Sequence, residues 1–322
     1  MEQLLSGTSA AVLVPYLYLA IGLGVLIGCG NLLVTGSVQI ARYFKISTLV
    51  VGLTIVAYVT SAPEMFISVG AALEGAHDIA LGNVIGANIA NIGCILAIVV
   101  IISPIPIRNK SIGFDYLIMF LATVLLFIFG FNGVIGFFEG LCFVLILIAY
   151  TVWSVMKSRK NHKAEQFEPA TIKPLFALLM ILAAVVGLYF SSNWFVKGAR
   201  EIALQWGVSE RVIAVSIVAV GTSMPELISS LIAAFRKEAD LSIGNIIGSN
   251  FFNITGVLGV STVVHKINVT DHTLFITDMI WLFAITIALL LIMLPLVRGK
   301  INRWEGVILL LMFSAYMVML YR

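Results

Sequence analysis

The stretch Ala57-Tyr-Val-Thr-Ser-Ala-Pro-Glu64 places a carboxylate, two hydroxyls and a proline in the middle of an apolar segment. The pattern returns as Ala219-Val-Gly-Thr-Ser-Met-Pro-Glu226, so that Glu226 follows Glu64 by 162 positions. Besides the first alanine, the threonine, the serine, the proline and the glutamate match at this offset. We therefore interpret the rest of the chain as a scaffold that brings the two segments face to face.

The composition indicates a polytopic all-α membrane protein. Of the 322 residues, 61% are hydrophobic and only 11% are charged, whereas about a quarter of the residues in a soluble domain are charged. We expect a multi-pass protein of the cell membrane that is surrounded by the lipid bilayer. The formal net charge of +3 is small, and we expect neither a nucleic-acid partner nor an obligate protein partner.

Ten segments are apolar over the length of about 20 residues that a membrane span requires. The predicted spans cover residues 15–39, 47–73, 79–102, 113–131, 134–156, 174–197, 209–235, 241–264, 273–297 and 303–321. The hydrophilic stretch 157–173 falls midway along the chain and is interpreted as a linker. The predicted halves are residues 1–156 and 174–322.

The distribution of Lys and Arg predicts the orientation, because cytoplasmic loops carry an excess of basic residues. If the N-terminus is outside, only five of the 19 basic residues lie outside: Lys197, Arg200, Arg211, Lys266 and Arg322. We therefore predict both termini outside and the linker inside.

Internal repetition at the same offset extends over more than about sixty residues. Asn31 matches Asn193, Gly36 matches Gly198, and Gly82-Asn83 matches Gly244-Asn245. Each half contains five predicted spans, an odd number, so equivalent helices must cross the membrane in opposite directions. Such an inverted repeat places a substrate site near the midplane, between the halves, and is typical of transporters.

Glu64 and Glu226 lie in apolar spans, where insertion scales assign a charged group a cost of about 2.5 to 3.5 kcal/mol. A structural salt bridge could offset this cost, but every Lys and Arg lies in a loop or at a span end. A protonated glutamate bonded to a neighbouring helix is a second structural alternative. Two symmetric acids with the same hydroxyl pattern are better explained by a bound cation.

The spacing within each motif supports an ion site. Thr60 and Ser61 precede Glu64 by four and three residues, so on a helix both hydroxyls share the face of the carboxylate. Pro63 lacks an N–H and should kink or open the helix just before Glu64. The carbonyls expected to be released there are those of Ala57 and Val59, and Pro225 should act likewise on those of Ala219 and Gly221.

The third and eighth predicted spans carry a second polar stripe. The segment Gly244-Asn-Ile-Ile-Gly-Ser-Asn-Phe-Phe-Asn253 places Asn245, Ser249 and Asn253 at four-residue intervals. The segment Gly82-Asn-Val-Ile-Gly-Ala-Asn-Ile-Ala-Asn91 has Asn83, Ala87 and Asn91 at the same positions. Close helix packing explains the paired glycines, and a single asparagine could serve only to join helices. Together with the acids, these segments offer oxygen donors alone, which suit calcium. The same oxygens could hold sodium instead, so the two ions would compete.

These paired motifs resemble the alpha repeats of the calcium/cation antiporter superfamily, in particular prokaryotic sodium/calcium exchangers. The likeness covers about residues 31–95 and 193–260. It implies ten helices in two inverted halves, with the first and sixth helices sliding to alternate access. It also implies calcium extrusion driven by sodium entry, with calcium and sodium as transported ions, no prosthetic group and no enzymatic activity. The ion ligands that it implies are Glu64 and Glu226, completed by Thr60, Ser61, Thr222, Ser223, Asn91, Asn253 and Ser249 and by the carbonyls of Ala57 and Ala219.

Three positions depart from the family pattern. Val59 stands where the second half has Gly221 and the family usually has glycine. Ala87 replaces the serine found as Ser249, which removes an oxygen. Asn253 stands where several exchangers carry aspartate, which makes potassium coupling less expected because an amide supplies no charge.

Two alternatives have distinct signatures. A cation/proton antiporter for calcium or manganese would typically carry an acid at the positions of Gly86 and Gly248. An intramembrane hydrolase would need an aspartate pair, a Ser-His pair or a zinc motif within the spans, and the motif segments contain none of these.

Overall fold

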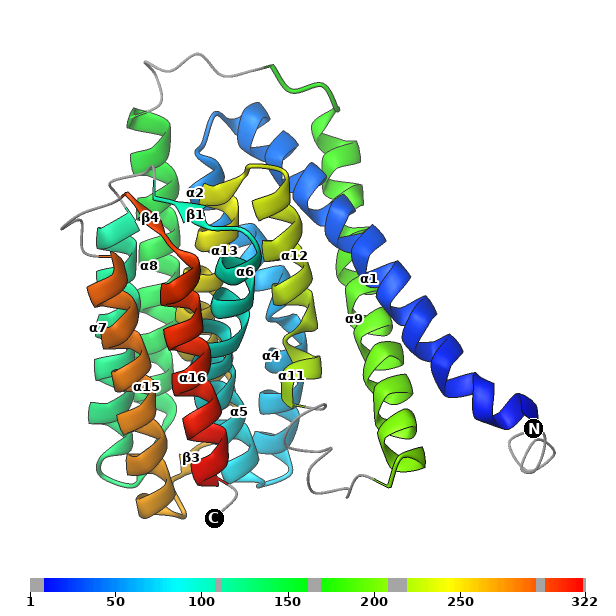
Figure 1. Cartoon of the computed structure of the whole chain (residues 1–322). Helices are drawn as coiled ribbons and strands as arrows, with labels where there is room; N and C mark the ends of the chain where they lie inside the picture. The colour runs from blue at the N-terminus through cyan, green and yellow to red at the C-terminus, as the bar shows by residue number, and fades with distance from the viewer. Residues whose placement is uncertain (1–8, 108–111, 162–168, 208–218, 294–298, 321–322) are drawn as a thin grey trace.

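The computed structural model describes residues 9–107, 112–161, 169–207, 219–293 and 299–320. Within these ranges the chain is almost entirely helical (Figure 1). The two long helices α1 (Ser9–Phe44) and α9 (Pro174–Gln205) pack on each other beside a bundle formed by the other helices. In the view of Figure 1 both lie to the right of that bundle, and α1 is strongly tilted.

Eight helical segments in the described ranges are long and apolar enough to cross a membrane. They are Leu13–Phe44, His77–Ile102, Ile112–Gly130, Phe137–Lys160, Pro174–Gln205, Ala239–Val264, His272–Met293 and Arg303–Leu320. Thr48–Thr60 and Ala62–Leu73 make a ninth when the bend between them is counted within one span. The predicted span over 209–235 begins outside the described residues, and its second part contains the shorter apolar helix Met224–Phe235. A polytopic helical protein is therefore confirmed.

Short breaks divide several of these segments. In the first half the helices are α2 (Thr48–Val51), η2 (Gly52–Val56), α3 (Ala57–Thr60), α4 (Ala62–Leu73), α5 (His77–Ala90), η3 (Asn91–Leu96), α6 (Ala97–Ile102), α7 (Ile112–Gly130) and α8 (Phe137–Asn161). In the second half they are α11 (Ala219–Thr222), α12 (Met224–Phe235), α13 (Ala239–Phe252), η6 (Asn253–Leu258), α14 (Gly259–Val264), α15 (His272–Met293) and α16 (Arg303–Leu320). The η segments are π-helical turns, which often mark functional sites.

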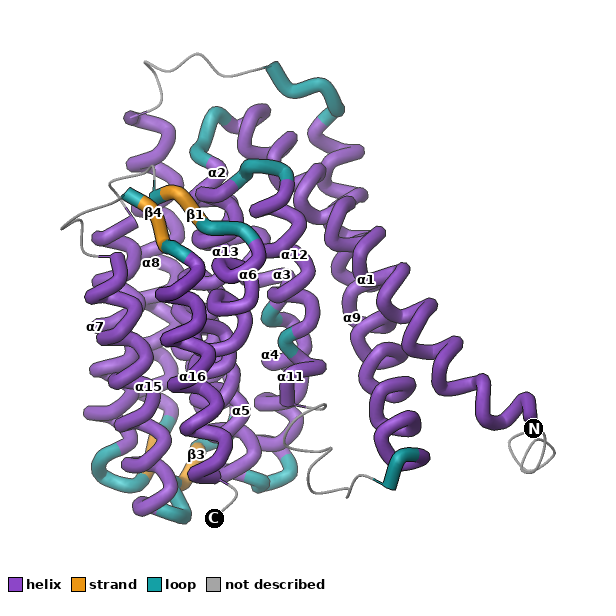
Figure 2. The backbone as a smooth tube through the Cα atoms, in the orientation of Figure 1, coloured by secondary structure: helices purple, strands orange, loops and turns teal. Residues whose placement is uncertain are grey.

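Two short antiparallel sheets join the halves. β1 (Ile105–Pro106) pairs with β4 (Lys300–Ile301), and β2 (Val134–Ile135) pairs with β3 (Ile267–Asn268). β1 and β3 are again 162 positions apart, Ile105 to Ile267, and they lie at opposite ends of the bundle (Figures 1 and 2). Each sheet contains one strand from either half, so both ends of the bundle are tied across the repeat.

The centre of the bundle is formed by equivalent helices of the two halves. Ile92 in η3 and Ile254 in η6 are both 0% exposed and belong to one hydrophobic core. Large apolar side chains elsewhere are exposed, among them Phe66, Phe138 and Trp304. Such a surface is expected where a helix faces lipid rather than water. The polar motifs therefore lie in the most enclosed part of the protein.

The crossing of α1 and α9 is reciprocal. A Cβ atom added at Gly36 would lie 2.8 Å from the carbonyl oxygen of Ala177, and one added at Gly198 would lie 2.6 Å from that of Pro15. Gly198 and Ala177 follow Gly36 and Pro15 by 162 positions each. Only glycine allows this backbone approach at both contacts, so the two helices cross through the same pair of positions used twice.

The ends of the bundle differ in charge. The first described turn of α1 and the last of α16 lie at one end, and the end of α8 and the start of α9 lie at the other (Figure 1). The connections α1–α2 and α12–α13 lie at the same end as the start of α9. Basic residues lie in these connections or in the helix turn before them: Arg42, Lys45, Arg236 and Lys237. The basic end of the protein is therefore the end that holds the flanks of the predicted linker.

Candidate ion-binding site

Each half interrupts its acid-bearing helix at the serine of the Thr-Ser pair. Between α3 and α4, Ser61 has φ −86° and ψ 11°, and the two helices differ in direction by 49°. Between α11 and α12, Ser223 has nearly the same values, φ −90° and ψ 11°. The following prolines at positions 63 and 225 lack an N–H, which explains why the helix opens there. The predicted break just before each glutamate is confirmed.

The break was expected to release the carbonyl of Ala57, but this carbonyl remains hydrogen-bonded. It accepts the Ser61 N–H at 3.0 Å and the Thr60 hydroxyl at 3.3 Å. The reason is that Pro63 removes the donor for the carbonyl four residues earlier, that of Val59, and leaves the donor for Ala57 in place. An ion at the Ala57 carbonyl would compete with these contacts. Ala219 is the first residue of α11, and its side chain lies outside the described residues.

The two glutamates are buried and only partly hydrogen-bonded. Glu64 and Glu226 are each 1% exposed, and the Oε2 atom of each has no hydrogen-bond partner within the described part of the chain. The hydroxyl of Ser61 donates to Glu226 Oε1 at 3.1 Å. Ser61 was expected to share a face with the carboxylate of its own half, and its hydrogen bond instead reaches the carboxylate of the other half.

Asn91 and Asn253 start the π-helical turns η3 and η6. Both are 1% exposed, and the Oδ1 atom of each lacks a hydrogen-bond partner among the described residues. The turn η3 packs on α12, which carries Glu226, and η6 packs on α4, which carries Glu64. Each asparagine therefore sits on an element that packs against the acid-bearing helix of the opposite half.

The remaining predicted residues are four hydroxyl-bearing side chains, those of Thr60, Ser249, Ser223 and Thr222. Thr60 is 0% exposed, and its hydroxyl lies 3.5 Å from that of Ser249 and 3.2 Å from Asn245 Oδ1. Ser223 is buried, and its Oγ has no partner among the described residues. Thr222 ends α11, directly before Ser223. The structure thus brings the hydroxyls of the first half toward the polar stripe of the second.

Buried oxygens without hydrogen-bond partners are the main chemical feature of the helices that pack together here. Within the described ranges they include Glu64 Oε2, Glu226 Oε2, Asn91 Oδ1, Asn253 Oδ1 and Ser223 Oγ. More than about 90% of buried polar groups in proteins have a partner, and leaving one unpaired costs about 1 to 3 kcal/mol. Carboxylate, amide and hydroxyl oxygens are the ligands of hard cations. The donor set therefore fits such an ion.

Sequence reasoning missed two further asparagines and two aspartates. Asn88 accepts a bond from Asn253 Nδ2 at 3.2 Å, and neither side-chain polar atom of Asn250 has a partner in the described ranges. Their spacing, three residues before Asn91 and Asn253, was the available signal. Asp115 and Asp278 are buried beside tyrosines, Tyr150 at 2.8 Å and Tyr316 at 3.1 Å. Those aspartates lie near span ends, where hydropathy patterns carry little information.

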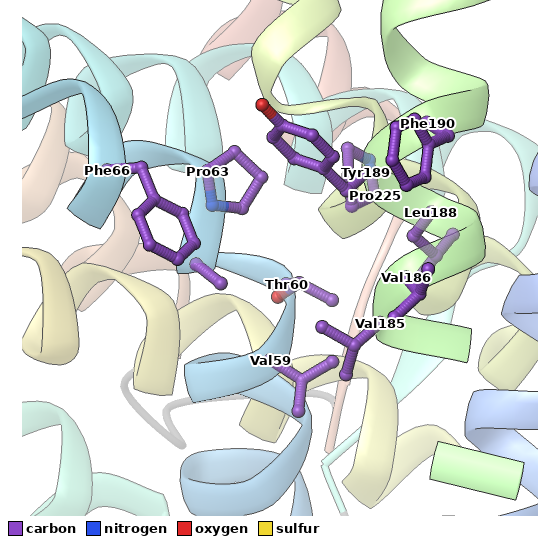
Figure 3. Close-up of a pocket in the computed structure, with 11 residues that line it drawn as sticks. Val59, Thr60, Pro63, Phe66, Val185, Val186, Leu188, Tyr189, Phe190 and Pro225 are labelled. Carbon is purple, nitrogen blue, oxygen red and sulfur yellow. The ribbon is translucent and has the colours of Figure 1, made fainter. Parts of the chain in front are cut away.

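A pocket of about 270 Å³ lies beside the bend of the first half, between it and α9 (Figure 3). Thr60 and Tyr189 contribute hydroxyl-bearing side chains to a wall that is otherwise apolar, including Val59, Val185 and Phe66. Pro63 and Pro225 both reach this pocket. One flank of the polar region is therefore separated from α9 by open space.

The sequence matches the model of the family described as sodium/calcium exchanger protein over residues 14–156 and 176–322. A putative antiporter, CaxA, of Alkalimonas amylolytica is 36% identical over 317 residues, which cover 96% of this chain and 99% of that protein. The sodium/calcium exchanger MaX1 of Methanosarcina acetivorans is 30% identical over 351 residues, covering 96% and 99%. An uncharacterized membrane protein of Methanocaldococcus jannaschii, MJ0091, is 33% identical over 296 residues, covering 92% and 94%.

The fold is similar to solved structures of the sodium-calcium exchanger NCX_Mj. The structure soaked with zero Na+ and Ca2+ superposes with a TM-score of 0.82 at 31% identity, covering 95% of this chain and 99% of that one. The structure soaked with 2.5 mM Na+ and 0.1 mM Ca2+ gives a TM-score of 0.80, also at 31% identity, with 94% and 97% covered. The likeness thus extends over nearly all of both chains.

Proposed function

The chain belongs to the sodium/calcium exchanger family, a family of cation antiporters and not of enzymes, and we propose that it extrudes calcium from the cell in exchange for sodium. Transport occurs by alternating access to one site in the middle of a cell membrane. The observation that carries this proposal is the set of buried oxygens, on Glu64, Glu226 and the elements that pack against their helices, that have no hydrogen-bond partner among the described residues.

In the proposed site the two carboxylates balance the charge of one calcium ion, or that of sodium ions in its place. The further ligands are neutral oxygens, in keeping with the six to eight that calcium usually takes. The proposed set is Glu64, Glu226, Thr60, Ser61, Thr222, Ser223, Asn91, Asn253 and Ser249 with the carbonyls of Ala57 and Ala219. Because calcium and sodium use the same oxygens, binding of one displaces the other, which is the basis of exchange.

The proposed topology is ten spans in two inverted halves, residues 1–156 and 174–322, joined by a cytoplasmic linker at 157–173, with both termini outside. Three observations support it. β1 and β3 occupy equivalent positions at opposite ends of the bundle, the crossing of α1 and α9 is reciprocal, and the family match is interrupted between residues 156 and 176. The basic end of the bundle is then the cytoplasmic end, as the distribution of Lys and Arg requires.

Transport in liposomes tests the proposal. Calcium uptake is measured under an outward sodium gradient, an outward proton gradient or no gradient, for the wild type and for Glu64→Gln and Glu226→Gln. We expect uptake with the sodium gradient only, and none in either variant. Glu201→Gln, a partly exposed residue of α9 outside the site, serves as a matched control that keeps wild-type uptake.

The results separate the proposal from its alternatives. Uptake that follows protons and ignores sodium would show a cation/proton antiporter for calcium or manganese instead. Unchanged uptake in both glutamine variants would refute the site while leaving the exchange activity in place.

A further inference from the structure

The hydroxyl of Thr60 has one proton and several neighbouring acceptors, and the carboxylate of Glu226 in the ion site is one of them. The hydroxyl also lies 3.2 Å from Asn245 Oδ1, 3.3 Å from the carbonyl oxygen of Ala57 and 3.5 Å from Ser249 Oγ. The carbonyl of Ala57 already accepts the Ser61 N–H at 3.0 Å. Among these three oxygens, which lie outside the two carboxylates, Asn245 Oδ1 is the acceptor with the shortest distance and the least competition.

A hydroxyl binds a cation through its oxygen, so its proton must point away from the ion toward an acceptor. A hydroxyl oxygen has two lone pairs and a single proton. When the Thr60 proton points to Asn245 Oδ1, both lone pairs are available elsewhere. Without that acceptor, the proton is free to turn toward the ion site and oppose binding.

The orientation of the Asn245 amide follows from the protons around it. Asn245 Nδ2 lies 3.0 Å from Ser229 Oγ and 2.8 Å from Ser230 Oγ. The Ser229 hydroxyl donates its own proton to the backbone carbonyls of Pro225 and Glu226, which lie at 2.7 and 3.1 Å. Ser229 can therefore only accept from the amide. This fixes the NH2 group on the serine side and the oxygen on the side of Thr60.

Asn245 also touches the acid-bearing helix directly. Its amide lies 3.5 Å from the backbone carbonyl of Glu226, and its side chain is 1% exposed. In the first half Asn83 makes the equivalent contact, 3.2 Å from the backbone carbonyl of Glu64. Asn245 therefore joins the helix of one carboxylate to a hydroxyl that comes from the opposite half.

We propose that Asn245 is a positioning residue for the exchanged ions, which orients the Thr60 hydroxyl so that its oxygen faces the site. It does not touch the ion. The inference rests on the proposed function, because it requires an ion at Thr60. It adds a residue outside the ligand set, and it predicts that Asn245 affects affinity only through Thr60.

A double-mutant cycle tests this dependence, since residues that act through one another are not additive. Calcium binding to the purified protein is measured by calorimetry without sodium for the wild type, Asn245→Ala, Thr60→Val and the double variant. We expect Asn245→Ala to weaken binding about tenfold, at the lower end of the range for groups that orient metal ligands. In the Thr60→Val background the same change should weaken binding less than about twofold.

Ser242→Ala is the matched control. Ser242 is equally buried, lies on the same helix, and donates to the backbone carbonyl of Ser230 at 2.8 Å. We expect it to lower the melting temperature about as much as Asn245→Ala does, with calcium affinity unchanged. This comparison separates a positioning role from general loss of packing.

Several outcomes would overturn the inference. Equal weakening by Asn245→Ala in both backgrounds would show a structural role, and unchanged affinity in Thr60→Val would remove Thr60 from the site. If the wild type binds neither calcium nor sodium, the proposed function fails and the inference fails with it. If calcium binds and the cycle is non-additive but no sodium-driven exchange occurs in liposomes, the inference stands and only the exchange reaction is refuted.

Discussion

The two copies of the Thr-Ser-x-Pro-Glu motif have nearly the same backbone and different surroundings. In the second half, α9 covers the bend: Ser192 donates to the carbonyl of Gly221 at 2.7 Å, and the side chain of Val196 lies against the Gly221 backbone. In the first half, the equivalent Val59 lines the pocket beside α9. Four residues of the first motif line this pocket, whereas Pro225 is the lining residue from the second, so a symmetric sequence produces asymmetric surroundings in this conformation.

The same difference appears in the hydroxyls. Ser61 reaches Glu226 at 3.1 Å, whereas its counterpart Ser223 has no partner for its hydroxyl in the described ranges. An exchanger that alternates between two conformations needs such a difference, because identical halves would hold the site equally open to both sides. If the halves exchange roles as proposed, the Ser61 and Ser223 contacts are among those that should change.

The largest expected effect comes from removing a carboxylate. Glu64→Gln and Glu226→Gln should each reduce sodium-driven calcium uptake in liposomes by more than about 100-fold, beyond the range for groups outside the ligand shell. In the proposed site both halves supply charge to the same ion, so the losses should be equal even though the surroundings differ. A variant that keeps substantial uptake would show that only one half binds calcium.

The serine pair separates the halves most directly. In buffer without calcium or sodium, Ser61→Ala should lower the free energy of unfolding by about 1 to 3 kcal/mol, because it leaves Glu226 Oε1 without its donor. Ser223→Ala should not lower it, since no partner is lost and a buried hydroxyl without a partner is removed. Thermal unfolding of the two variants measures the comparison. Equal destabilisation would show that the conformation described here is not the predominant one without ions.

These contacts also show what the sequence could predict. The repeat, the two breaks and the buried acids follow from local features: a fixed offset, a proline without an N–H, and carboxylates in apolar segments. The bond from Ser61 to Glu226 does not, because helix spacing relates a serine only to the acid of its own segment. Asn88 and Asn250 were missed for a similar reason, since a stripe of asparagines does not say which side chain turns inward.

A solvent-exposed contact between α1 and the residue that follows α12 also differs between the halves. Arg236, after α12, donates to Thr35 Oγ1 and Asn31 Oδ1 of α1, both at 2.6 Å. At the offset of 162 positions, Thr35 and Asn31 correspond to Lys197 and Asn193 on α9, and Arg236 corresponds to Glu74. In this structure Asn193 bonds within its own helix, to the Tyr189 carbonyl, and Lys197 lies 4.8 Å from the ring centre of Tyr18.

We therefore expect Arg236→Gln to release α1 and to shift the balance between the two conformations about two- to fivefold, as fits a solvent-exposed contact. The accessibility of single cysteines introduced on either side of the site measures this balance. Arg303→Gln, at the start of α16, serves as a control that should leave the balance unchanged. No shift in Arg236→Gln would show that the contact does not hold α1.

The smallest expected effect comes from making the halves more alike. Ala87→Ser restores the hydroxyl that Ser249 supplies in the second half, at a buried position of α5. One added oxygen should strengthen calcium binding about threefold, the size of a single modest hydrogen-bonding gain. Calcium titration by calorimetry measures this change. Weaker binding would show that the first half has no room for an added hydroxyl.

The two small sheets impose an order on the assembly of the protein in the membrane. The partner of β1 is β4 and the partner of β2 is β3, so neither sheet can form while only the first five spans have been synthesised. During translation the nascent first half must wait with unpaired strand edges until residue 267 follows for one end and residue 300 for the other. The two pairings, one at each end of the bundle, are therefore late events, and the pairing of β1 with β4 requires that α15 has already been synthesised.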